Sequence, residues 1–100
     1  MKITRWTAEI PVNKDIIVKL FEAEGLEPRP FSIKSGSRLA NQKTFLNEII
    51  QVAEGELIFN LSGTQFVLRR GDKLEIPANT IYSFSNMRDE ESLFFSAQKI

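Results

Sequence analysis

The spacing of apolar residues predicts one amphipathic helix near the start of the chain. Between Lys14 and Glu24, apolar residues recur every three or four positions, so they lie on one face of a helix. Asn13, directly before this segment, is a favourable N-cap residue, and Gly25, directly after it, is typical of a helix end in the left-handed conformation. The apolar stripe consists of Ile16, Ile17, Leu20 and Phe21.

The rest of the chain alternates short apolar stretches with turn sequences, a pattern that predicts strands. The glycine turns Glu54-Gly55, Ser62-Gly63-Thr64 and Arg70-Gly71-Asp72 recur about 8–12 residues apart, a spacing typical of antiparallel sandwiches and barrels. We interpret Arg70-Gly71-Asp72 as a hairpin turn and not as an adhesion motif, because Gly-Asp is common turn chemistry. The predicted strands are 31–34, 43–53, 57–61, 65–69, 73–76, 81–85 and 93–98.

Composition narrows the chemistry that the chain can perform. With 100 residues, of which 42% are hydrophobic, the chain suits one globular domain. It contains no His and no Cys, which excludes histidine-based triads, thiolate chemistry, disulfides and His- or Cys-ligated metal sites within one chain. The formal charge of +0 argues against a nucleic-acid-binding protein.

No targeting or membrane-spanning segment is predicted. Residues 1–10 include Lys2 and Arg5 but no apolar stretch behind them, unlike a signal peptide. No apolar run approaches the roughly 18–20 residues of a transmembrane helix. We therefore expect a cytoplasmic protein with no membrane partner.

Two glycine-anchored stretches, at residues 36–55 and 71–86, carry a recognisable pattern. The first reads G-x5-Q-x-T-x3-E-x6-G and the second reads G-x5-P-x-N-x2-Y-x3-N. Together they resemble the paired motifs of the cupin superfamily, G-x5-H-x-H-x3,4-E-x6-G and G-x5-P-x-G-x2-H-x3-N. Asn79 replaces a glycine of the family pattern, and Asn tolerates positive φ better than other non-glycine residues. The identical anchors are Gly36, Glu48, Gly55, Gly71, Pro77 and Asn86.

This resemblance implies that residues 1–100 form a single cupin-like domain. The implied fold is all-β, a double-stranded β-helix (jelly-roll) barrel, with one short N-terminal helix. In typical cupins three His and one Glu bind a metal inside the barrel; here Gln42, Thr44 and Tyr82 replace the His, and Glu48 alone matches. These side chains suit a transition metal poorly, so we expect no metal and no cofactor. A weak hard-cation site through Glu48 and Gln42 stays open.

The resemblance also implies that the replaced ligands face the interior of the barrel. Gln42, Thr44, Glu48 and Tyr82 are therefore the candidate ligand-binding residues, at one level of an apolar cup. The alternative is that side chains fill the barrel and that these polar groups only bond to one another. Because side chains alternate between the two faces of a strand, the inward face also includes Leu46, Ile50, Val52, Phe84 and Asn86.

In the predicted strand 43–53, the residues between the inward-facing ones point out of the barrel. They include Phe45, Ile49 and Ala53. Large apolar residues on an outer face need a cover. Either the stripe of the N-terminal helix, aided by Trp6, covers them, or a second subunit does. We favour a homodimer.

We expect a metal-free cupin-domain protein that binds a small-molecule ligand or serves as a regulatory module. The alternative is a metal-independent isomerase or epimerase that uses Glu48 and Tyr82 as its acid/base pair, because a carboxyl in an apolar cup has a raised pKa. A metal-dependent oxygenase or isomerase ranks last. Whether the chain is an enzyme stays open.

Overall fold

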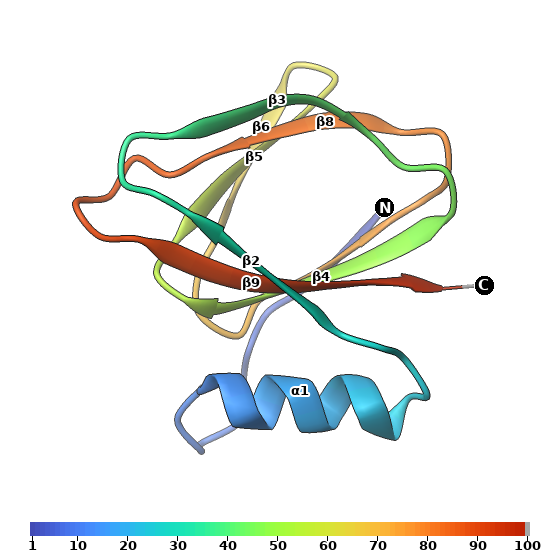
Figure 1. Cartoon of the computed structure of the whole chain (residues 1–100), viewed down its shortest axis with the longest axis vertical. Helices are drawn as coiled ribbons and strands as arrows, with labels where there is room; N and C mark the ends of the chain where they lie inside the picture. Colours follow the sequence, from blue (N-terminus) through green and yellow to red (C-terminus); the bar gives the residue numbers. More distant parts are fainter. Residues whose placement is uncertain (100) are drawn as a thin grey trace.

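In the computed structural model, which describes residues 1–99, two antiparallel sheets pack face to face and one helix lies outside them (Figure 1). One sheet has five strands in the order β1-β7-β4-β9-β2, and the other has four in the order β3-β8-β5-β6. This architecture confirms the predicted all-β fold with one short N-terminal helix. The elements are β1 Lys2–Thr4, α1 Lys14–Ala23, β2 Arg29–Ile33, β3 Arg38–Lys43, β4 Asn47–Glu54, β5 Leu57–Leu61, β6 Thr64–Leu68, β7 Lys73–Ile76, β8 Ile81–Ser85 and β9 Ser92–Lys99.

The helix forms as its sequence predicts. The Asn13 side chain accepts a hydrogen bond from the backbone N–H of Ile16, at 2.9 Å, and so caps the first turn. After the last turn, Gly25 adopts a φ of 74°, the left-handed conformation in which helices commonly end.

The prediction of one long strand over 43–53 is wrong. The chain leaves the four-stranded sheet after β3 and enters the five-stranded sheet at β4. Thr44 fixes this crossing: its hydroxyl donates to the carbonyl of Pro77 at 2.7 Å and accepts from the N–H of Thr80 at 2.9 Å. These contacts tie the crossing to the loop between β7 and β8. Strands β1 and most of β3 were not predicted.

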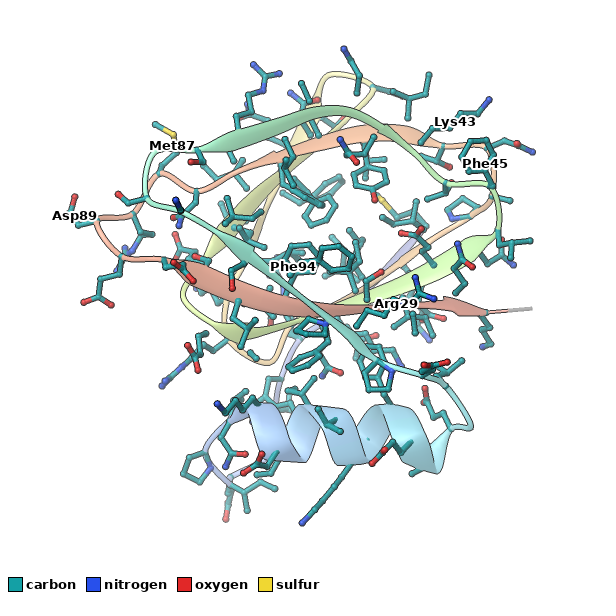
Figure 2. The ribbon with its side chains drawn as sticks, in the orientation of Figure 1. Arg29, Lys43, Phe45, Met87, Asp89 and Phe94 are labelled. Atoms are coloured by element: carbon teal, nitrogen blue, oxygen red, sulfur yellow. The ribbon has the colours of Figure 1, made fainter. Side chains whose placement is uncertain are left out.

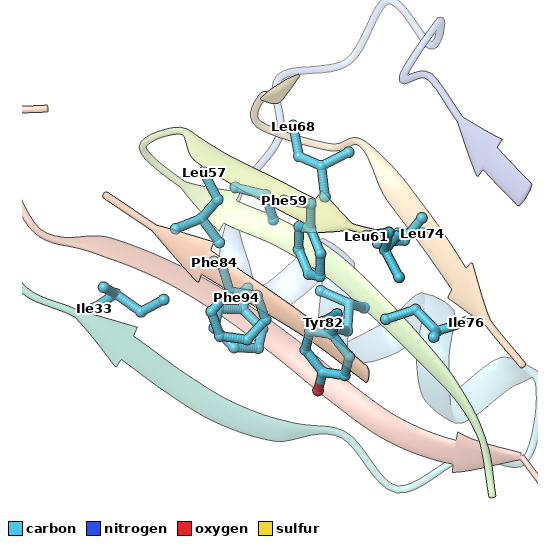
Figure 3. Packing of buried hydrophobic residues seen from close by; sticks show 12 residues of the cluster. Ile33, Leu57, Phe59, Leu61, Leu68, Leu74, Ile76, Tyr82, Phe84 and Phe94 are labelled. Atoms are coloured by element: carbon cyan, nitrogen blue, oxygen red, sulfur yellow. The ribbon is translucent and has the colours of Figure 1, made fainter. Parts of the chain in front are cut away.

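Aromatic and aliphatic side chains fill the space between the sheets (Figure 3). Ile50 and Val52 point inward, as their alternation predicts, whereas Leu46, predicted on the same face, is exposed in the connection before β4. The ring of Phe59 lies 4.7 Å from that of Phe84 and 5.6 Å from that of Tyr82, measured between centroids. The inner core therefore is a packed interior, with Ile33, Ile50, Val52, Leu57, Phe59, Leu61, Leu68, Leu74, Ile76, Tyr82, Phe84 and Phe94.

Helix α1 covers the outer face of the five-stranded sheet. Ile17 and Phe21 of the helix are buried against Ile49 and Ala53 of β4 and against neighbouring residues of β9. Of the two predicted covers, the chain's own helix is therefore the one observed. Phe45 does not belong to this face, because it lies exposed in the β3–β4 connection. The homodimer stays a prediction that this face does not require.

The segment after β1 closes the sandwich beside the β6–β7 turn. The Asp72 carboxylate is buried and accepts from Arg5 Nη1 at 2.6 Å, from the Arg69 N–H at 2.9 Å and from the Trp6 N–H at 3.2 Å. The Trp6 side chain lies directly on Gly71, where an added Cβ would sit 2.5 Å from that of Trp6. Arg70-Gly71-Asp72 is thus a turn with a structural role, but the predicted hairpin is wrong, because the turn joins β6 of the four-stranded sheet to β7 of the five-stranded sheet.

Asn86, the last anchor of the second motif, is a fully buried structural residue. Its amide donates to the carbonyls of Ile33 and Glu90, at 2.9 and 2.8 Å, and its carbonyl accepts from the Arg88 N–H. It thereby joins β2, β8 and the loop before β9. Asn79 adopts a φ of 61°, as expected for a replacement of glycine.

Within residues 1–99, no helix has the length and apolar character needed to span a membrane. The cytoplasmic location stays a prediction.

Substituting Phe21→Ala tests the packing of α1. Removing this buried ring leaves a cavity against β4 and β9, and we expect the free energy of unfolding to fall by about 3–4 kcal/mol in urea denaturation. The control Leu20→Ala alters the exposed face of the same helix and should change it by less than about 1 kcal/mol. Equal losses would contradict the assigned packing.

Substituting Asp72→Ala tests the closure by the N-terminal segment. Because the change leaves two backbone N–H groups and Arg5 without their acceptor, we expect a loss of about 2–4 kcal/mol in urea denaturation. Asp89→Ala, in an exposed loop, should cost less than about 0.5 kcal/mol. A small effect at Asp72 would show that the segment contributes little.

Candidate functional site

Glu48 and Tyr82 meet at one end of the barrel, although they come from different sheets. Glu48 stands at the start of β4, two residues before the inward Ile50, and therefore faces inward. Tyr82 stands at the start of β8, with its ring in the inner core and its hydroxyl at the edge of the cluster (Figure 3). That hydroxyl donates to Glu48 Oε2 at 3.4 Å. The pair is the polar end of an otherwise apolar interior.

Burial sets the protonation behaviour of this pair. It raises the pKa of the Glu48 carboxyl, and the hydrogen bond from Tyr82 offsets only part of that rise. Burial, followed by the charge of Glu48 and the hydrogen bond to it, also raises the pKa of Tyr82 well above its ordinary value. Tyr82 therefore stays protonated near neutral pH and acts as a hydrogen-bond donor.

The other two predicted site residues have different surroundings. Gln42 lies directly across from Tyr82 in the β3–β8 register, and its amide donates to the carbonyl of Ala40 at 3.1 Å. Thr44 is fully buried and its hydroxyl is occupied by the β7–β8 loop. Thr44 and Glu48 do not share one strand, as the predicted strand 43–53 required, because Thr44 lies in the connection between β3 and β4. The structure brings together Glu48 and Tyr82, with Gln42 beside Tyr82, and gives Thr44 a structural task.

A pocket of about 410 Å³ opens beside Glu48. Arg29 and Phe31 reach it from β2, whose side chains at these positions lie opposite Ser96 and Phe94 of β9. Sequence analysis missed these β2 and β9 residues. The sequence shows which of their side chains share a face, but it does not show the strand pairing that brings β2 and β9 close to Glu48. The lining residues are Gly25, Leu26, Glu27, Arg29, Phe31, Glu48, Ser96, Ala97 and Gln98.

A second pocket of about 310 Å³ reaches Glu48 from the side of β7. Lys2, Glu75 and Lys99 contribute its charged groups, and Pro77 and Ile76 part of its wall. Glu48 is thus accessible from two directions, although the barrel behind it is packed. Figure 2 shows Lys43 and Phe45 at this end of the barrel, and Met87 and Asp89 at the other.

These residues do not fit the metal that typical cupins hold. The Thr44 hydroxyl and the Gln42 amide are engaged with backbone groups, and the Tyr82 phenol is held in its protonated form. Glu48 remains as the one carboxylate of the set. Within residues 1–99, no three Asp or Glu side chains gather to form a cation site. Of the four candidate side chains, Glu48 and Tyr82 thus form a hydrogen-bonded pair, whereas Gln42 and Thr44 bond to the backbone.

Comparison with known proteins identifies the fold. No protein-family model matches the sequence, and no curated protein is significantly similar to it. Among solved structures, a cupin superfamily protein from Desulfitobacterium hafniense superposes with a TM-score of 0.66 at 17% identity, over 75% of this chain and 67% of that one. A cupin-like protein from Thermotoga maritima superposes with a TM-score of 0.67 at 21% identity, over 74% and 56%.

Drosophila melanogaster CENP-C, solved bound to CAL1, superposes with a TM-score of 0.64 at 22% identity, over 72% of this chain and 60% of that one. The chain thus spans less than two thirds of the Thermotoga and Drosophila proteins. At these identities the comparison concerns architecture, and the resemblance found in the two sequence motifs agrees with it. The chain has the β-barrel fold of the cupin superfamily.

Proposed function

We propose that the chain is a small-molecule-binding module that holds its ligand at the open end of the barrel. One observation carries this proposal: the half-buried Glu48 carboxyl, hydrogen-bonded by Tyr82, opens into a pocket of about 410 Å³. A carboxyl kept partly out of water costs stability, which favours a functional over a stabilising role for Glu48. Because side chains fill the barrel, we propose that the ligand binds at its mouth and not inside it.

The groups around the pocket favour a particular ligand chemistry. Tyr82 donates to Glu48 Oε2, so Oε1 is left to accept from a ligand amine or hydroxyl. Phe31 offers an apolar face, because its ring is 44% exposed and stacks on that of Phe94 at 5.3 Å. A ligand with one hydrogen-bond donor and one apolar ring matches both features.

Acid–base catalysis by Glu48 and Tyr82 ranks behind binding. The two groups are in contact, which such a mechanism requires. A general acid works best when its pKa lies near the operating pH, however, and the pKa of Tyr82 is raised well above its ordinary value. The phenol is thus a strong positioning donor for Glu48 and a poor proton source.

A regulatory role is the second candidate function. It is supported by the structural similarity to CENP-C, which was solved bound to another protein, CAL1. This role uses protein surfaces and does not depend on the pocket at Glu48.

Ligand-observed NMR with a panel of ring-bearing amines and alcohols, and with the matching carboxylic acids, tests the binding function. We expect amines or alcohols to bind, and Glu48→Gln and Phe31→Ala each to weaken that binding at least about fivefold, which corresponds to roughly one hydrogen bond or apolar contact. Glu54→Gln, on the same strand at its other end, and Met87→Ala are matched controls that should bind normally. Unchanged binding by Glu48→Gln would overturn the proposal.

The stability of Glu48→Gln separates a ligand site from a structural hydrogen bond. Because the pKa of Glu48 is higher in the folded than in the unfolded chain, the folded state binds more protons, and stability falls as pH rises through the interval between the two values. Glutamine at position 48 does not ionise, so it removes this loss of stability, while its side-chain oxygen can still accept the hydrogen bond from the Tyr82 hydroxyl. We expect Glu48→Gln to be more stable than wild type at pH 7 in urea denaturation, and the gap to close toward pH 4. A less stable variant at pH 7 would indicate a structural role.

A further inference from the structure

The outermost strands β2 and β3 leave one side of the sandwich without a neighbour. β2 ends the five-stranded sheet and pairs with β9 alone, and β3 ends the four-stranded sheet and pairs with β8 alone. The turn over residues 34–37 joins them (Figure 1). A free strand edge presents backbone N–H and C=O groups that can pair with an added strand.

Two apolar side chains are exposed along these edges although they belong to the inner face. Phe31 lies opposite Phe94 and Leu39 lies opposite Phe84, so each shares the inward face of its partner. The partners are 2% and 4% exposed, whereas Phe31 is 44% and Leu39 40% exposed. The sandwich therefore lacks its cover at this side, which supplies two apolar anchoring points.

The charge of this region is of one sign. Residues 28–47 contain four basic residues and no Asp or Glu, in a chain with 13 basic and 13 acidic residues overall. The ion pairs within residues 1–99 involve Arg5, Arg69 and Lys73, and none of these four. Their positive charges thus lie without an acidic partner along β2, β3 and the joining turn. The four residues are Arg29, Lys34, Arg38 and Lys43.

From these three observations we infer that β2 and β3 form a docking surface for an acidic, extended segment of another protein. Backbone pairing on a free edge, apolar anchors at Phe31 and Leu39, and ion pairs with the four basic residues would hold it. Along β3, Leu39 shares the inward face of Phe84, whereas Arg38 and Lys43 lie on the opposite face, across from Ser85 and Ile81. A segment added to this edge would therefore carry apolar and acidic residues alternately.

The same features oppose pairing of two copies of this chain edge to edge. Basic residues on both edges would repel each other. An acidic partner removes the charge penalty, which is why we assign the surface to such a partner and not to a second copy.

Fluorescence anisotropy with the whole chain tests this surface. The probe is a labelled ten-residue peptide that alternates glutamate with valine, and its counterpart has lysine in place of glutamate. We expect the glutamate peptide to bind, with an affinity that falls as salt rises, and the lysine peptide not to bind. The double substitution Arg38→Glu, Lys43→Glu should weaken binding at least tenfold, and Leu39→Asp should also weaken it. Lys14→Glu with Lys19→Glu, on α1, makes the same charge change and should leave binding intact.

Changes in backbone amide chemical shifts, measured by NMR, locate the peptide on the protein. We expect the amides of β2 and β3 to shift on binding. Equal binding of the two peptides, no loss in the β3 variants, or shifts confined to other strands would each overturn the inference. So would tighter binding of single-stranded DNA than of the peptide, or self-association that the β3 variants abolish. Arg38, Leu39 and Lys43 do not line the pocket at Glu48, so this test can fail while the small-molecule proposal stands.

Discussion

The packing of aromatic rings between the two sheets is the constraint on which the rest of the structure depends. Phe59 contacts both Tyr82 and Phe84, Phe84 meets Phe94, and Phe94 stacks on Phe31, so one row of rings crosses the interior from the mouth to the open side. Close-packed interiors of this kind leave no room for a ligand in the centre. The two proposed binding surfaces therefore lie where the row ends, at Tyr82 and at Phe31.

Those ends differ in character. At Tyr82 the row finishes in a phenol that holds a carboxyl, which gives a compact site for a hydrogen-bond donor. At Phe31 it finishes in an exposed ring flanked by basic residues, which gives a broader surface. One side chain, Phe31, lines the pocket and also borders the free edge. A ligand in the pocket and a segment on the edge would then compete for, or share, the same ring.

What the sequence could predict follows from how local each feature is. The helix and its cap at Asn13, and the alternation of Ile50 and Val52, depend on neighbours a few residues away, and they were predicted correctly. The break at Thr44 depends on bonds to Pro77 and Thr80, more than thirty residues later in the sequence. The sequence of β3 is polar and does not alternate apolar with polar residues, so it does not predict a strand. Its extended conformation comes from pairing with β8. The nearness of Glu48 and Tyr82 came from the motif resemblance alone.

The position of β9 has a consequence for how the chain is made. This strand follows both β2 and β4 along the chain, yet it lies between them in the five-stranded sheet. Until it emerges from the ribosome, β2 has no partner in its sheet and the apolar face of α1 lacks half of the surface it packs against. The five-stranded sheet therefore cannot close before β9 has emerged, and the nascent chain must keep the apolar segments of β2 and α1 apart until then.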